Sequence, residues 1–269
     1  MTERLLHLSN IKKTFNPDTV NEKRVLKGLS LTIHKGDFIS VIGGNGAGKS
    51  TLLNIISGAI KPDSGQIQME GKDITRTGEV NRAKDIARVF QNPSLGTAPR
   101  MTIAENLAIA MKRGERRLFG RSLTNTNKAY FKKLLASLDL GLEDRLDDSL
   151  DLLSGGQRQA ISLLMATIKK PKLLLLDEHT SALDPKAAGK VMSLTDQAIQ
   201  EDQITSLMIT HNMKQAIDYG NRLIMLHQGQ IILDMQGPAK EELTVDRVLD
   251  LFQSQTLDQE VTDSLFLSD

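Results

Sequence analysis

The sequence predicts an α/β fold built on a parallel β-sheet, and three observations lead to this prediction. A short apolar run at residues 38–42 leads into a glycine-rich loop and then into a segment with helical spacing. A second run, residues 173–176, is purely aliphatic, as in strands that are buried on both faces of a sheet. The chain has 269 residues, a length that suits one large unit with an inserted subdomain.

The overall composition narrows the possible functions. There is no cysteine, so disulfides, iron–sulfur clusters and zinc–thiolate sites are excluded. With 34 basic and 33 acidic residues the formal charge is +1, which argues against nucleic acid as a partner, because nucleic-acid binders carry a basic surplus. No stretch of about 18 apolar residues occurs, and residues 1–10 do not resemble a secretory signal. We therefore expect a cytoplasmic protein that reaches any membrane through a partner.

The N-terminal residues predict a small antiparallel sheet at the edge of the core. Residues 5–11 and 25–33 alternate aliphatic with polar side chains, and a turn-rich segment separates them. Phe15 ends the first of these strands. Its ring either stacks on an adenine base or caps the core of the small sheet, and the periodicity favours neither alternative.

The glycine-rich loop after residue 42 has the pattern of a phosphate-binding P-loop. It consists of Gly43, Gly44, Asn45, Gly46, Ala47, Gly48, Lys49, Ser50 and Thr51. The glycines let the backbone turn tightly and direct N–H groups at an anion, and the following helix adds the positive end of its dipole. Lys49 is then placed to reach the terminal phosphates, and the Ser50 hydroxyl to hold a magnesium ion. The alternative is an ordinary turn between a strand and a helix.

Two segments follow the predicted P-loop helix. Residues 86–90 have the pattern of a buried strand and place Gln91 at its end, where the amide either binds magnesium and the attacking water or merely caps a loop. Residues 102–148 have a helical pattern that begins with a capping box of Thr102 and Glu105. A basic cluster within this region is expected to form a solvated face, with contact to acidic lipid or a partner as the alternative. Its members are Arg113, Arg116, Arg117 and Arg121.

A second helix start with anion-binding character lies in the middle of the chain. Ser154 stands where an N-cap belongs, and Gly155 and Gly156 allow close approach to a ligand. Gln157 and the residues after it continue into an apolar helical face. The alternative is an ordinary capped helix, but the presence of a P-loop in the same chain favours a ligand.

Polar residues follow the later buried strands. Asp177 and Glu178 end the aliphatic run, where Asp177 is placed to order the magnesium shell and Glu178 to polarise a water molecule. His211 follows a strand at 206–210, and ligands bind at this edge of open α/β sheets. Two more strands (residues 223–226 and 231–234), a closing helix (residues 241–252) and a polar tail (residues 253–269) complete the expected elements.

Together these motifs resemble the nucleotide-binding subunit of ABC transporters over about residues 4–252. They occur in the family order: the Walker A loop (residues 43–51), the Q-loop glutamine (Gln91), the LSGGQ signature (residues 153–157), Walker B with its glutamate (residues 173–178), the D-loop (residues 181–184) and the switch histidine (His211). The resemblance implies a P-loop NTPase cassette with a RecA-like parallel-sheet core and an N-terminal antiparallel β subdomain. It also implies a helical signature subdomain inserted at about residues 95–170.

The resemblance further implies a site shared between two subunits and the cofactors ATP and Mg²⁺. In a head-to-tail dimer, here expected to be a homodimer, ATP on the Walker A loop of one subunit is covered by the signature of the other. The residues implied on the signature side are Ser154, Gly155, Gly156 and Gln157, and Asp184 of the D-loop belongs to the same nucleotide site. Phe15 falls at the adenine-stacking position.

The same resemblance assigns the chemistry of ATP hydrolysis. Ser50 and Gln91, and Asp177 through water, are implied to order magnesium. Glu178 is implied to be the general base, and His211 to hold the γ-phosphate and orient the water. Gln91 and its neighbouring helices are implied to receive an integral membrane permease, so that the subunit works at the cytoplasmic face of the cell membrane.

One departure from the family pattern points to a subgroup. His179 follows Glu178 where most members have proline, and this run resembles bacterial subunits that accompany a separate permease and a substrate-binding protein, some for aromatic amino acids. Import of a small, amino-acid-like solute is therefore the leading interpretation. An exporter motor and a soluble ABC ATPase that acts on ribosomes or DNA are the alternatives; a P-loop kinase or GTPase would leave the LSGGQ stretch unexplained.

Overall fold

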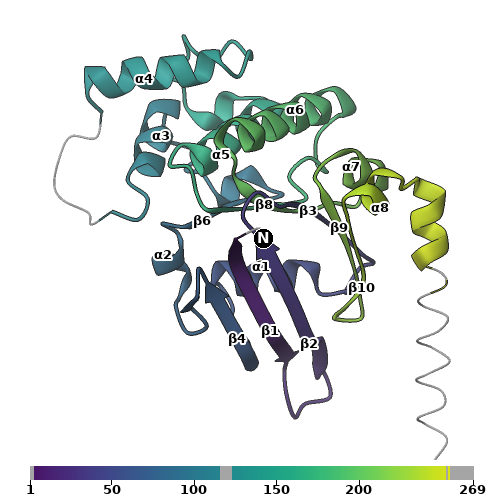
Figure 1. Cartoon of the computed structure of the whole chain (residues 1–269). Helices are drawn as coiled ribbons and strands as arrows, with labels where there is room; N and C mark the ends of the chain where they lie inside the picture. Colours follow the sequence, from purple (N-terminus) through teal and green to yellow (C-terminus); the bar gives the residue numbers. More distant parts are fainter. Residues whose placement is uncertain (1–2, 116–122, 253, 255–269) are drawn as a thin grey trace, which may run out of the picture.

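The computed structural model describes residues 3–115, 123–252 and 254, and contains two β-sheets with helices around the larger one (Figure 1). In spatial order the six strands of the larger sheet are β10 (Gln230–Gln236), β9 (Arg222–His227), β3 (Phe38–Ile42), β8 (Thr205–Ile209), β7 (Leu173–Asp177) and β6 (Ile86–Val89). The strands from β9 to β6 pair in parallel, whereas β10 is antiparallel to β9. The predicted parallel core is confirmed.

The smaller sheet is antiparallel, as predicted. Its four strands, in order, are β2 (Lys23–His34), β1 (Arg4–Phe15), β4 (Ser64–Met69) and β5 (Lys72–Asp73). Phe15 ends β1, as predicted, and pairs with Lys23 of β2. Register shifts along the ladder let the pairing of β1 and β2 continue past the alternating segments.

Strand β7 shows how the larger sheet separates two hydrophobic cores. Leu173 and Leu175 belong to the core that also contains α1 (Lys49–Ser57), the helix after the P-loop. Leu174 and Leu176 belong to the core on the opposite face, with α5 (Gly155–Thr167). Alternate side chains of a strand point to opposite faces, so the two helices cover opposite faces of one sheet, as Figure 1 shows.

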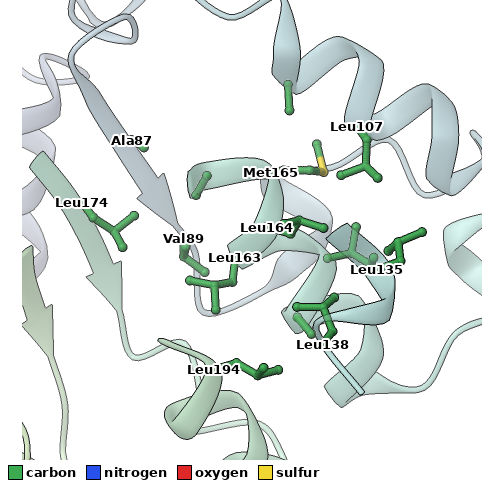
Figure 2. Close-up of a cluster of buried hydrophobic side chains, with 14 of the residues drawn as sticks. Ala87, Val89, Leu107, Leu135, Leu138, Leu163, Leu164, Met165, Leu174 and Leu194 are labelled. Carbon is green, nitrogen blue, oxygen red and sulfur yellow. The ribbon is translucent and has the colours of Figure 1, made fainter. Parts of the chain in front are cut away.

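The core above the sheet is built mainly from four helices. They are α3 (Ile103–Met111), α4 (Asn125–Ala136), α5 and α6 (Pro185–Asp202). Figure 2 shows Leu135, Leu163 and Leu164 of these helices gathered over Val89 and Leu174 of the sheet. The helical part therefore packs on the sheet as one continuous hydrophobic cluster.

In the described part of residues 102–148, the predicted helical pattern resolves into α3, α4 and irregular chain. The capping box of Thr102 and Glu105 is confirmed at the start of α3. Left-handed residues at Asp139 and Gly141 follow α4, and such backbone is incompatible with a continuing helix. A 3₁₀ turn at Leu150–Leu152 then leads to α5, as another at Pro93–Leu95 follows β6.

Arg113 belongs to the basic cluster predicted in this region, but its side chain does not lie on a solvated face. Its guanidinium is half-buried and donates to the carbonyls of Met165 and Ala166 in the last turn of α5. Burial there lowers the pKa of Arg113. The prediction for Arg113 was therefore wrong, because the long side chain reaches helix-terminal carbonyls that lack partners within the helix. The other three arginines of the cluster, Arg116, Arg117 and Arg121, lie outside the described residues.

The closing helix predicted at residues 241–252 is also wrong in detail. The structure has a short helix α8 (Pro238–Glu241), a break at residues 242–244, and a second helical segment at residues 245–252. Thr244 causes the restart, since its hydroxyl accepts a hydrogen bond from the Arg247 N–H. The tail at residues 253–269 falls, apart from residue 254, outside the described chain.

Two short helices complete the fold: α2 (Glu79–Arg82) before β6 and α7 (Met213–Asp218) after β8. No helix within the described part of the chain is long and apolar enough to cross a membrane.

Candidate nucleotide site

The predicted P-loop connects β3 to α1 and needs glycine for steric reasons. Gly43 has φ +151°, and a Cβ there would lie 2.2 Å from the carbonyl oxygen of Leu226. Gly48, the N-cap of α1, has φ +103°, and a Cβ there would lie 2.8 Å from Leu26. Any larger side chain would therefore push the loop off β9 or β2, so the glycines keep the loop tight against the sheet.

Lys49 is folded back onto the loop that precedes it. Its Nζ donates to the carbonyl oxygens of Gly43 (2.7 Å) and Gly44 (3.1 Å), and the residue is 6% exposed. Burial lowers the pKa of the ammonium, while the carboxylates of Glu178 and Asp177 act in the opposite direction. The ammonium thus lies beside the two acids that end β7, and phosphate oxygens are the acceptors that suit a lysine held in this position.

Asp177 is paired with an arginine that the sequence reasoning missed. Arg88 of β6 donates to Asp177 Oδ2 at 2.5 Å and to Asn54 Oδ1 of α1 at 2.6 Å. The guanidinium also lies 4.7 Å from the ring centre of Phe90. Arg88 and Asp177 are 12% and 15% exposed, so this is a largely buried ion pair that joins β6, β7 and the P-loop helix. A lone arginine in an otherwise apolar buried strand was the signal available in the sequence.

Glu178 and His211 meet directly at the ends of neighbouring strands. His211 Nε2 lies 2.6 Å from Glu178 Oε1, and the Glu178 side chain is only 12% exposed. The Glu178 N–H donates to the carbonyl of Ile209 in β8, which fixes the loop after β7 against the strand that leads to His211. The structure therefore brings together the two residues predicted to handle the attacking water.

Gln91, which was expected to bind magnesium, contacts Ser181 in this structure. Its Nε2 donates to Ser181 Oγ at 3.1 Å, and Ser181 Oγ in turn donates to the carbonyl of Glu178. The glutamine thus contacts the loop that carries Glu178, through Ser181. Its proposed place beside magnesium stays a prediction.

Phe15 lies at the edge of the same region. It pairs across the ladder with Lys23, whose Nζ would lie 3.6 Å from a Cβ added at Gly46 in the P-loop. Phe15 is half-buried, and the ammonium of Lys13 lies 5.6 Å from its ring centre. An aromatic face therefore stands near the P-loop, where an adenine base could stack, but the stacking stays a prediction.

The signature residues lie on the other face of the sheet from α1. Ser154 caps α5 in a capping box with Gln157, whose Nε2 also donates to the carbonyl of Leu140. Gly156 packs on the first turn of α6, where a Cβ would lie 2.9 Å from the Cβ of Ala187, and Gly155 approaches Leu183. The glycines thus have a packing reason within the chain, and Ser154 and Gly155 remain exposed.

Asp184 has a structural role at the start of α6. Its Oδ1 accepts from the backbone N–H groups of Lys186 and Ala187, at 3.1 and 3.0 Å, as an N-cap. The residue is exposed. Its contact with nucleotide stays a prediction.

The residues present suit a magnesium ion that also has phosphate ligands. Ser50 is exposed at the start of α1, and Asp177 keeps one carboxylate oxygen clear of Arg88. These are oxygen donors, the type that Mg²⁺ prefers. In the described chain no three His, Asp or Glu side chains form a metal-binding group.

Comparison with known proteins identifies the family. The model of the ABC transporter family matches residues 26–181. A tyrosine transport ATP-binding protein of Clostridioides difficile is 47% identical over 250 residues, 93% of this chain and 99% of that protein. A spermidine/putrescine import ATP-binding protein of Spiroplasma citri is 36% identical over 231 residues. The matched region covers 86% of this chain and 61% of that relative.

Two solved structures share the fold along most of the chain. The ADP conformation of MJ1267, an ATP-binding cassette of an ABC transporter, has a TM-score of 0.75 and 30% identity, and covers 93% of this chain and 99% of its own. The dimeric post-hydrolysis state of the cassette MJ0796 with ADP and Pi has a TM-score of 0.73 and 28% identity, over 86% and 98% of the two chains. With its P-loop, its paired acids and histidine, and these matches, the chain belongs to the ABC transporter family as an ATP-binding cassette ATPase.

Proposed function

We propose that this chain is the ATP-hydrolysing subunit of an importer for tyrosine or a closely related amino acid. The observation that carries the proposal is the 47% identity, over 93% of the chain, with a tyrosine transport ATP-binding protein. In this proposal the subunit works with a separate permease and with an extracytoplasmic binding protein. Such a subunit acts at the cytoplasmic face of the membrane.

The active form that we propose is a head-to-tail homodimer around two ATP molecules. Within one chain the P-loop and the signature helix lie on opposite faces of the sheet, so they cannot close on the same nucleotide. The exposed N-terminus of α5, with Ser154 and Gly155 at its tip, is free to cover a nucleotide on a second copy. The positive end of a helix and its N–H groups suit a γ-phosphate. A solved relative with this fold is dimeric with ADP and Pi.

In the proposed site the chain binds ATP mainly through the P-loop. The backbone N–H groups of residues 43–51 and the Lys49 ammonium hold the phosphates, and Phe15 stacks on the adenine. Ser50, Gln91 and Asp177 would hold Mg²⁺, which supplies charge neutralisation at the phosphates when bound. On ATP binding Lys49 exchanges the carbonyls of Gly43 and Gly44 for phosphate oxygens, which are better acceptors for an ammonium.

Glu178 and His211 act on the attacking water. The Glu178 carboxylate accepts a proton from the water that attacks the γ-phosphate, ADP is the leaving group, and His211 holds the γ-phosphate and orients the water. Their 2.6 Å contact holds the carboxylate towards the site before nucleotide arrives. Positioning and charge stabilisation supply most of the rate increase.

We also propose the division of the chain into one cassette, residues 4–252, with a helical part at about residues 95–170. The helices α3, α4 and α5 support this division, because they follow one another in the chain between β6 and β7, two strands that are neighbours in the sheet. Gln91 stands at the junction and links the helical part to the loop of Glu178 through Ser181. A permease that presses on this junction would thereby influence hydrolysis.

Reconstitution tests this function. The chain is expressed with its chromosomal neighbours, copurified with its permease, and placed in proteoliposomes with the binding protein. We expect ATP-dependent uptake of labelled tyrosine that unlabelled tyrosine suppresses. Copurification with ribosomes instead of a polytopic membrane protein, or efflux instead of uptake, would contradict the proposal.

A further inference from the structure

His179 follows the proposed general base, yet its side chain is directed into the protein. The residue is 2% exposed, and its Nε2 lies 3.0 Å from Thr195 Oγ1 in α6. Thr195 is fully buried as well. The loop after β7 is therefore fixed on α6 through a buried imidazole, one residue from the Glu178 carboxylate.

A second contact of Thr195 favours one assignment of donor and acceptor. Thr195 Oγ1 also lies 2.8 Å from the carbonyl of Val191, and when it donates there it accepts from His179. That arrangement requires the neutral imidazole with its hydrogen on Nε2. Burial lowers the pKa of His179 to about 4, which keeps the ring neutral at physiological pH.

The backbone of Glu178 needs support from its neighbours. Its φ is +48°, a left-handed conformation that is costly for a residue with a side chain. The Glu178 N–H is bonded to the Ile209 carbonyl, and the Glu178 carbonyl accepts from Ser181 N–H and Oγ. Those hydrogen bonds hold the backbone of Glu178 itself, and the side chain of His179 fixes the residue that follows it.

A further contact extends this support to His211. Thr180 Oγ1 and Thr210 Oγ1 both approach Gln215 Oε1 of α7, at 3.5 and 3.1 Å. Thr180 follows His179, and Thr210 precedes His211. The loop fixed by His179 is thus also joined to the segment that carries the partner of Glu178.

We propose that His179 is a positioning residue: its bond to Thr195 anchors the loop after β7 on α6 and so sets the place of the Glu178 carboxylate. The inference rests on the proposed function, in which Glu178 is the general base. It assigns a role to the residue that stands where most family members have proline. A side chain in the core replaces the fixed φ of proline as the means of holding the loop.

Steady-state kinetics of the purified full-length chain with MgATP test the role. In His179→Leu we expect kcat to fall roughly tenfold to a hundredfold, the loss that a misplaced catalytic group brings, with KM and nucleotide affinity within about twofold. His179→Gln presents an amide Nε2 donor of similar reach and should restore most of kcat. Thr195→Val should match His179→Leu, and the double variant should be no slower than either single variant, because both remove one interaction.

Two controls separate this role from general destabilisation and from failure of the proposed function. Thr167→Val removes a buried hydroxyl that likewise bonds a carbonyl of its own helix but contacts no histidine, and kcat should stay unchanged. Unfolding temperatures of all variants are measured alongside. The inference fails if Gln and Leu at position 179 are equally slow, if both retain wild-type kcat, or if Thr167→Val loses as much activity as Thr195→Val. Normal turnover in Glu178→Gln would instead overturn the base assignment itself.

Discussion

The two faces of the larger sheet carry the two halves of the proposed site, and they differ in how their polar groups are satisfied. On the P-loop side, Lys49 bonds loop carbonyls, Asp177 bonds Arg88 and Glu178 bonds His211. On the signature side, Ser154 caps its own helix and stays exposed. The polar groups on the P-loop side are thus organised before ligand arrives, whereas the signature side is a surface that, in the proposed dimer, gains a ligand only by meeting another molecule.

The strongest test of this comparison removes the proposed base from the organised side. In Glu178→Gln we expect ATP binding to persist and hydrolysis to fall more than about 100-fold, the contribution of a general base. The ATP-bound dimer should accumulate, which size-exclusion chromatography with ATP detects. Glu242→Gln, at an exposed position, serves as the control. Near-normal turnover in Glu178→Gln would refute the assignment.

A change on the signature side should separate binding from turnover. We expect Ser154→Arg to bind ATP normally, since the P-loop is on the other face, but to lose hydrolysis by about tenfold or more, because the contacts that orient the phosphates are lost. The ATP-dependent dimer should not form. Thr124→Arg is the matched control, because Thr124 is also an exposed N-cap, at the start of α4. A fully active Ser154→Arg homodimer would disprove the shared site.

The Arg88–Asp177 pair can be tested through stability. Arg88→Met leaves Asp177 without its cation, and we expect a loss of about 2 kcal/mol in the free energy of unfolding without nucleotide, less than for a fully buried pair. MgATP should recover part of the loss, because the metal replaces the missing charge. Lys132→Met breaks an exposed pair with Asp144 and should cost less than about 1 kcal/mol. Denaturant melts with and without MgATP measure both; equal losses in the two variants would show that Arg88 has no special role.

The lowered pKa of His179, about 4, predicts a pH dependence of stability. Between pH 6.5 and 4 the unfolded chain binds a proton there and the folded chain does not, so stability falls as the pH drops below 6.5. From pH 7 to 5 the contribution is about 1–2 kcal/mol. It should be absent in His179→Gln. Denaturation curves at both pH values, compared between the two proteins, measure the difference; an identical pH dependence would exclude His179 as its source.

The smallest expected effect concerns Phe15. If the ring stacks on adenine, Phe15→Ala should weaken ATP binding by about 1 kcal/mol, roughly fivefold, and Phe15→Tyr should restore it. Binding of triphosphate without a base provides the control, because it should not change. If the ring only caps the small sheet, Phe15→Ala will lower stability and leave ATP affinity intact.

Much of this architecture could be predicted because its signals are local. The aliphatic run of β7, the glycines after β3 and the Ser154 cap each define an element within a few residues. Interactions between distant segments were less accessible. Nothing near Arg88 indicates Asp177, 89 positions later, and nothing near His179 indicates Thr195. Two helix breaks were also missed. At Asp139 a left-handed backbone, and at Thr244 an N-cap, overrides the apolar pattern that predicted a continuous helix.

The alternation along β7 also limits how the gene can vary in length. Its four leucines serve the two cores in turn, and Asp177 shares the P-loop side with Leu173 and Leu175. If one residue of β7 were deleted or inserted, every later side chain of the strand would point to the opposite face of the sheet. The Asp177 carboxylate would then point away from the phosphates. Natural insertions and deletions should therefore accumulate in the connections of the chain and be excluded from this strand.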